Sequence, residues 1–282
     1  MNTTLEYLLP SKPTNAITEA ALAIFIAEPL PAPEVLSELY QSKWNDFFST
    51  NKALVVKTLG LQLASPESEF ETQSQPDRIV GYEFQRSNDN GYEWLFRSVN
   101  EDNHQVVSVH CLDYQHWHIF RPQALQLIEE YVEFHQTKTS KHPLTFAFGL
   151  SYVDMFTWDA QEYPPLKSIF REDSPYLPRT YLERQHSWQN TSVLQSNPPE
   201  AAMREYFEKY SERIDIQLVY GDTNSQIFIN HQVVMMLQKP DEVQSMLGNT
   251  IFEQGLKWAH SNNKQLLLKT LTEEVCKKIH LS

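Results

Sequence analysis

The chain has 282 residues, enough to bury a large hydrophobic core, and its two cysteines, Cys111 and Cys276, lie far apart without a CxxC pattern. Its 36 acidic and 23 basic residues give a formal net charge of -13, which disfavours binding to nucleic-acid backbones and favours cationic partners. The longest apolar run, residues 20–27, is far shorter than a membrane span and no secretory signal precedes it, so we expect a cytoplasmic protein with reduced thiols.

The first half of the chain reads as a strand, a helix, an antiparallel meander and a second helix. The meander is indicated by strand-like runs that are separated by short clusters of Asn, Asp and Gly. The second helix has apolar residues on one side and Glu and Gln on the other. The predicted elements are strand 20–26, helix 33–48, strand 54–63, polar loop 65–77, strands 79–87, 92–99 and 104–112, and a helix that begins at Pro122 and runs through 136.

The second half repeats much of this order. A buried strand is predicted from Leu144 to about Phe156, and the proline-rich segment 158–178 is expected to be irregular. A hairpin follows at 214–220 and 227–237, then helices at 240–260 and from Thr272 onward. The sequence therefore predicts an α+β protein with two similar lobes of antiparallel sheet covered by helices, residues 1–140 and 141–282. A diverged duplication is one hypothesis for this order, although the residues themselves do not repeat.

Several short motifs resemble one family of proteins. A Tyr and Trp pair, Tyr114 and Trp117, precedes the amphipathic helix, and a strand of the form Gly-Leu-x-Tyr occurs at 149–152. His260 and Asn263 stand ahead of an apolar stretch and the Thr-Glu pair that caps the last helix, within 271–274. In this order and spacing the chain resembles a sporadically distributed bacterial family of uncharacterised proteins, about 250 to 280 residues long.

The resemblance runs through nearly the whole chain and implies a bacterial α+β protein. Members of the family often lie among mobile or defence-associated genes, and no reaction is established for them. The sequence departs from the family pattern at two places where an arginine is expected, because Ser151 occupies the Gly-Leu-x-Tyr strand and residues 23–26 of the first strand contain none. Any function that depends on those arginines is therefore not implied for this chain.

The densest group of potential metal ligands is His110, Cys111, Asp113, His116 and His118. Imidazole, thiolate and carboxylate groups can together bind zinc. The spacing favours a polar cluster at the end of a strand, because side chains of neighbouring residues in a strand point to opposite faces. We therefore predict no metal ligands, with His110, Asp113, His116 and His118 as the alternative set.

Other catalytic patterns are incomplete. Asp77 and Glu83 partly match the paired carboxylates of a nuclease, but Gln85 stands where that pattern has a lysine. Ser151 lacks the second glycine of a nucleophile elbow, and the chain has neither G-x-G nor G-K-[ST] spacing for phosphate binding. We therefore predict no catalytic residue and no cofactor.

The remaining signal is a group of aromatic residues interleaved with acidic ones in and beside the proline-rich segment: Trp158, Tyr163, Tyr176, Tyr181 and Trp188. An exposed aromatic surface of this kind could bind a basic protein, whereas rings that cover the sheet would be structural. The leading hypothesis is a non-enzymatic protein-binding factor, such as an antitoxin, immunity or phage-defence component, without membrane or direct nucleic-acid binding. The alternative is a hydrolase with an unrecognised, metal-dependent site near 110–118.

Overall fold

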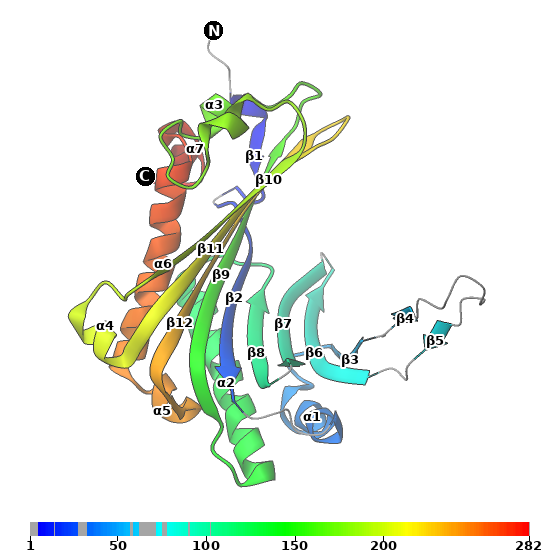
Figure 1. The fold of residues 1–282 in the computed structure, drawn as a ribbon. Coiled ribbons are helices and arrows are strands. Elements are labelled where there is room, and N and C mark those ends of the chain that lie inside the picture. Colours follow the sequence, from blue (N-terminus) through cyan, green and yellow to red (C-terminus); the bar gives the residue numbers. More distant parts are fainter. Residues whose placement is uncertain are drawn as a thin grey trace, which may run out of the picture.

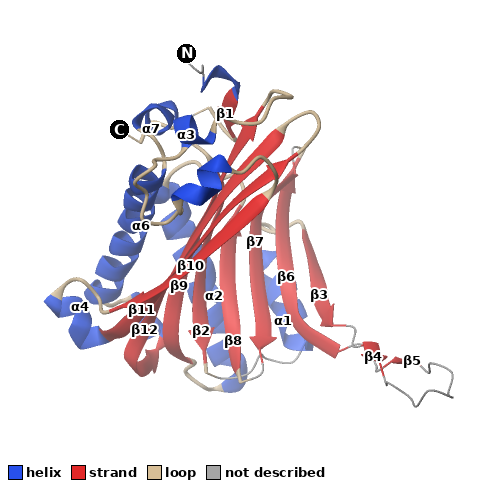
Figure 2. Ribbon diagram, turned by 45° about the horizontal axis from the view of Figure 1, so that its top comes forward, coloured by secondary structure: helices blue, strands red, loops and turns tan. Residues whose placement is uncertain are grey.

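The protein folds around one large antiparallel sheet (Figures 1 and 2). The computed structural model describes residues 5–13, 15–27, 33–56, 59–61, 72–74, 78–89, 91–101 and 103–281. The large sheet has the strand order β10-β11-β12-β9-β2-β8-β7-β6-β3, with β1 added beside β9, and β4 pairs with β5 separately. The strands are β1 (Leu8–Pro10), β2 (Ile17–Ile26), β3 (Thr50–Val56), β4 (Leu59–Leu61), β5 (Thr72–Ser74), β6 (Arg78–Asn88), β7 (Gly91–Glu101), β8 (His104–Cys111), β9 (Leu144–Trp158), β10 (Trp188–Ser196), β11 (Phe207–Tyr220) and β12 (Ser225–Glu242).

Helices α1, α2 and α6 lie on one face of the sheet, and the figures show the other face of the central strands uncovered (Figures 1 and 2). Buried and partly buried residues alternate along β8 and along most of β12, as expected for strands with one covered face. The α-helices are α1 (Pro33–Leu39), α2 (Trp117–Thr139), α3 (Leu166–Ile169), α4 (Ala201–Tyr206), α5 (Val243–Leu247), α6 (Thr250–Thr270) and α7 (Glu273–Lys278). Among the described helices, none is long and apolar enough to span a membrane.

The two halves of the chain meet at the pairing of β2 with β9. These strands run antiparallel, from Ile17 opposite Asp154 to Ile26 opposite Thr145. In each half the first long strand also pairs with the last one, β2 with β8 and β9 with β12. The predicted α+β class is confirmed, and both halves contribute to a single sheet. We refer to the β2–β9 pairing as the seam.

The structure differs from the predicted elements in several places. In the predicted helix 33–48 the α-helix ends at Leu39, and Tyr40–Trp44 form a π-helical turn. Helix α2 begins at Trp117, so Pro122 lies inside the helix and not at its start. The predicted helix 240–260 is divided near Gly248 into α5 and α6, and α6 continues to Thr270. Strand β10 and helix α4 were not predicted. The end of the predicted strand 54–63 and most of the predicted loop 65–77 lie outside the described residues.

Two hydrophobic clusters fill the space between the sheet and its covering segments. The first packs α1, α2 and α6 against the sheet and contains Trp44, whose Nε1 donates to Glu130 Oε2 on α2 at 2.7 Å. The second contains Phe156, Trp158 and residues of the 158–188 region, α6 and α7. Both cysteines are free and buried, Cys111 in the first cluster and Cys276 in the second.

Candidate functional site

A cavity of about 570 Å³ lies where the two hydrophobic clusters meet, on the helix-covered side of the seam. Its wall is formed by residues 15–17 before and within β2, residues 114–118 around the start of α2, and residues of α6 between 260 and 267. Asp154 of β9 and residues 279–281 after α7 complete it. A volume of this size is typical of sites for small molecules. We call it the seam cavity.

Asp154 is the acidic residue of the cavity wall. It lies opposite Ile17 of β2 and Ile229 of β12 and is 1% exposed. Its Oδ2 atom is buried and has no hydrogen-bond partner among the described residues. Burial raises the pKa of the Asp154 carboxyl to about 7, because removal from water disfavours the ionised form. Such a carboxyl can exchange a proton with a bound molecule near neutral pH.

A chain of aromatic side chains stands beside Asp154. Tyr152 and Asp154 lie two residues apart on β9, and the alternation of a strand places both on its helix-covered face. Tyr152 Oη lies 2.8 Å from His260 Nδ1, and the rings of Tyr114 and Tyr152 meet edge to face at 5.9 Å. The His260 ring stacks on Trp117, with centroids 4.4 Å apart. The cavity wall on this side is therefore rigid and aromatic.

The His260 imidazole is neutral near pH 7. Burial lowers its pKa to about 4, and the nearby Lys264 ammonium acts in the same direction. Burial also raises the pKa of the Tyr114 and Tyr152 hydroxyls above the usual range for tyrosine. His260 and Tyr114, which line the cavity, can therefore offer hydrogen bonds to a ligand without charge.

Asn263 is held in the cavity wall by a buried polar chain from the sheet. Its Oδ1 lies 3.0 Å from Nδ1 of His231 on β12, and His231 Nε2 lies 2.8 Å from Glu212 Oε1 on β11. Glu212, His231 and Asn263 are all at most 5% exposed. Asn262 Nδ2 also donates to Glu212 Oε1 at 2.9 Å. These buried hydrogen bonds fix α6 relative to β11 and β12, and so fix the position of this wall.

Exposed side chains that can carry positive charge surround the opening. His116 and His118 lie at the start of α2, with rings 5.2 Å apart, and Lys264 and His280 lie on the other side of the cavity wall. His116 is the N-cap of α2 but gives no side-chain hydrogen bond to the first turn. Because residues 116–118 line the cavity, the N-terminal end of α2, which is the positive end of its dipole, lies at this wall.

Four of the residues quoted for the resemblance come together at this cavity. Tyr114, Trp117, His260 and Asn263 line it, and Tyr152 contacts His260 behind the wall. Asp154 and Lys264 were not predicted as site residues. Asp154 carried a signal, because it is a carboxylate within a run predicted to be a buried strand.

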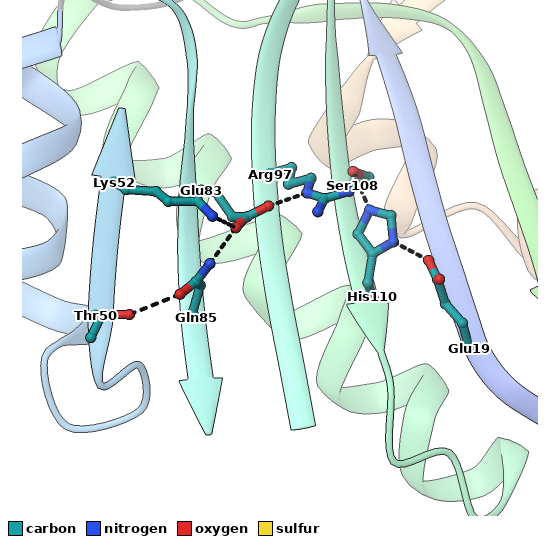
Figure 3. Close-up of polar contacts among 8 residues, drawn as sticks. All are labelled: Glu19, Thr50, Lys52, Glu83, Gln85, Arg97, Ser108 and His110. Carbon is teal, nitrogen blue, oxygen red and sulfur yellow. Dashed lines mark hydrogen bonds and ion pairs between the residues drawn. The ribbon is translucent and has the colours of Figure 1, made fainter. Parts of the chain in front are cut away.

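The alternative metal ligands do not assemble into one site. His110 lies on the uncovered face of β8, where its Nδ1 is 2.6 Å from Glu19 Oε1 (Figure 3). Asp113 forms an ion pair with Lys12 at 2.9 Å, whereas His116 and His118 lie at the seam cavity. Within the described residues, no three His, Cys, Asp or Glu side chains gather where they could hold a metal ion.

Two residues of the incomplete nuclease pattern, Glu83 and Gln85, belong to a network on the uncovered face of the sheet (Figure 3). Glu83 is 3% exposed in its side chain and forms ion pairs with Arg97 and, at 2.9 Å, with Lys52, while Gln85 donates to it. Burial raises the pKa of Glu83, but the hydrogen bonds from Lys52, Gln85 and Arg97 outweigh it and lower the value to about 2. Its charge is thus neutralised within the protein. Asp77 lies outside the described residues.

The aromatic residues expected on an exposed surface are mostly enclosed. Trp158 and Trp188 are 4% and 5% exposed and belong to the second hydrophobic cluster. Tyr163, Tyr176 and Tyr181 are partly buried and pack against the same cluster. The physical cause is that these rings pack with the end of α6 and with α7 against the sheet and help to enclose the second cluster.

The chain matches no protein-family model, no curated protein and no solved structure.

Proposed function

We propose that this protein is an enzyme that binds a small polar molecule in the seam cavity and uses Asp154 as a general acid or base. The observation that carries the proposal is the buried Asp154 carboxyl, whose Oδ2 has no partner among the described residues although it borders a cavity of about 570 Å³. Burial of an unsatisfied polar atom costs free energy, and such features are concentrated at functional sites.

The surrounding residues support acid–base chemistry. A carboxyl with a pKa of about 7 is present in both protonation states near neutral pH, which is the condition for efficient proton transfer. His260, which Tyr152 holds from behind the wall, stays uncharged, so it can orient a substrate by a hydrogen bond while Asp154 moves the proton. Hydrolysis, the alternative predicted from the sequence, is one reaction of this class.

The leading sequence-based hypothesis, a non-enzymatic factor that binds a basic protein, stays a prediction. It retains the support of the net charge of -13. The aromatic surface proposed for that partner has lost its main support, since Trp158 and Trp188 are buried.

The test is a binding screen followed by a search for turnover. Polar metabolites that raise the thermal stability of the wild-type protein are incubated with it, and products are sought by mass spectrometry. We expect D154N to lower the turnover rate by about 10² to 10⁴ fold, the usual contribution of a general acid or base. D222N, at an exposed turn residue, is the matched control and should keep the wild-type rate. Ligands that bind in the cavity and are never transformed would argue against an enzyme.

We also propose that the two halves arose by duplication. In residues 1–140 and 141–282 alike, the first long strand pairs with the last, and a long helix, α2 or α6, follows that last strand. The next strands outward from the seam, β7 and β6 in one half and β11 and β10 in the other, also correspond in order. A solved homologue with one half alone, paired as a dimer through its first strand, would support this origin.

A further inference from the structure

We infer that the seam cavity selects an anionic ligand, a small carboxylate or phosphate compound whose charged group lies at the opening between α2 and α6 and whose hydrogen-bond donor reaches Asp154. This inference rests on the proposed function and specifies the class of substrate. It follows from the distribution of charge around the cavity and not from the overall charge of the chain.

The opening holds the groups that bind anions. Lys264 is exposed and forms no ion pair among the described residues, so its ammonium is available to a ligand. His116, His118 and His280 add imidazole N–H donors around the same opening. Helix α2 has 23 residues and no side-chain cap; the N–H groups of Ile119 and Phe120 bond the His116 carbonyl oxygen, which leaves those of Trp117 and His118 as further donors. Four of the ten histidines of the chain, His260 included, line this one cavity.

The inner wall gives the site its second half. Asp154 is 1% exposed, borders the cavity and has an oxygen without a partner among the described residues. A hydroxyl or amine of the ligand would satisfy that oxygen. A helix N-terminus and a lysine alone would not indicate a binding site. Here the same cavity also contains a buried acceptor oxygen without a partner among the described residues, which is an independent indication of a ligand.

The contrast with the rest of the surface strengthens the inference. The chain carries 13 more acidic than basic residues, yet among the described residues that line the cavity Asp154 is the one carboxylate. Its partly protonated state at neutral pH reduces the repulsion of an anion. A cationic ligand would lie beside Lys264 without a compensating charge at the opening.

The experiment measures binding of inorganic phosphate and succinate to the full chain by isothermal titration calorimetry at constant ionic strength. Glycerol and ethanolamine serve as neutral and cationic probes. The site is located by the ¹H–¹⁵N signal of the Trp117 indole, assigned with W117F, because this ring lines the cavity. We expect at least one anion to bind and to shift this signal. Lys264→Met should weaken that binding by about tenfold or more, since a hydrogen bond to a charged group is lost.

Lys269→Met is the matched control, an exposed lysine on the same helix that does not line the cavity, and it should bind the anion as the wild type does. Equal anion binding by the Lys264 and Lys269 variants, or binding of glycerol or ethanolamine but neither anion, overturns the inference. A D154N protein that retains full turnover would instead overturn the proposed function and leave the anion site standing.

Discussion

Asp154 and Glu83 show how one kind of side chain acquires opposite properties from its neighbours. Both are buried carboxyls within the sheet, but Glu83 has Lys52, Gln85 and Arg97 around it and its pKa falls to about 2. Asp154 has no such partners in the described part of the chain, and burial alone raises its pKa to about 7. The first carboxylate stabilises the fold through its ion pairs, whereas the second makes the fold less stable when it ionises.

The sign of this effect gives a prediction on stability. The folded-state pKa of Asp154 is raised above the ordinary aspartate value of 3.8, so the carboxyl binds its proton more tightly in the folded than in the unfolded chain. The stability that proton binding by Asp154 gives the folded protein is fully present below about pH 4. It declines as the pH rises toward 7 and does not change further above that pH. The total loss is at most about 4 kcal/mol, because each tenfold change in proton affinity corresponds to about 1.4 kcal/mol.

We therefore expect D154N to gain stability relative to the wild type as the pH rises from 4 to 7, with no further gain above pH 7. The measurement is the free energy of unfolding in urea at several pH values. His260 lines the same cavity, and because its pKa is lowered, its protonation destabilises the folded protein as the pH falls. This effect is common to both proteins and cancels in the difference between them. If the difference in free energy of unfolding between D154N and the wild type did not change with pH, the raised pKa of Asp154 would be contradicted. For the control D222N we expect no such change with pH.

Four of the cavity residues stood in the motifs of the resemblance, but the sequence predicted neither the cavity nor a site at these residues. Tyr114, Trp117, His260 and Asn263 were marked by the resemblance, but they come from segments far apart in the chain, and their spacing says nothing of a shared space. Asp154 was missed because a single carboxylate in a strand is more often a surface residue. Its isolation from any cation depends on tertiary contacts, which no local pattern contains.

At the scale of elements, Gly81 lies where β6 leaves no room for a side chain beside β7. A Cβ atom on Gly81 would lie 2.2 Å from the carbonyl oxygen of Ser98, far inside van der Waals contact. Gly81 also pairs with Leu54 on β3, so a shift of β6 would disturb both of its neighbours. This glycine is therefore required by space and not by an unusual backbone angle.

Gly81→Ala should lower the free energy of unfolding by about 1–3 kcal/mol, the usual cost of inserting a methyl group into a filled space. Gly248→Ala is the control, because a Cβ there meets its nearest atom, Gln244 O, at an ordinary 3.6 Å. Urea unfolding of both variants beside the wild type provides the comparison. Equal stability of the two variants would show that the β6–β7 spacing adjusts without cost.

Alternation and turn residues predicted β6, β7, β8, β11 and β12, because each strand has one covered face and short separators. Strand β10 was missed for a physical reason. It lies at the edge of the sheet, most of its side chains are partly or fully exposed, and Val193 and Leu194 break the alternation that a covered strand shows. Pairing with β11, and not its own pattern, makes it a strand.

At the scale of the whole molecule, the seam decides whether the halves behave as one unit. The sequence predicted lobes at 1–140 and 141–282, but it could not predict that β2 would pair with β9, since nothing local specifies that neighbour. Hydrogen bonds along the seam and the shared contact of α2 and α6, which includes an Arg121–Glu253 ion pair at 3.0 Å, join the halves. The predicted domain boundary thus falls within a continuous structure.

We expect thermal unfolding to occur in a single cooperative transition. Neither half can separate without exposing the backbone of β2 or β9 and the clusters beside them. Scanning calorimetry checks this, because the calorimetric and van't Hoff enthalpies agree for a two-state transition. Two resolved transitions would instead support independent domains at 1–140 and 141–282.

The burial of both cysteines makes the chain convenient for spectroscopic labelling. Burial raises the pKa of the Cys111 thiol to about 12 and also raises that of Cys276, and maleimide reagents attack the thiolate. A new cysteine at Val193, which is 60% exposed on edge strand β10, would therefore react far faster than either native thiol. A dye or spin probe could be attached there while Cys111 and Cys276 keep their places in the interior.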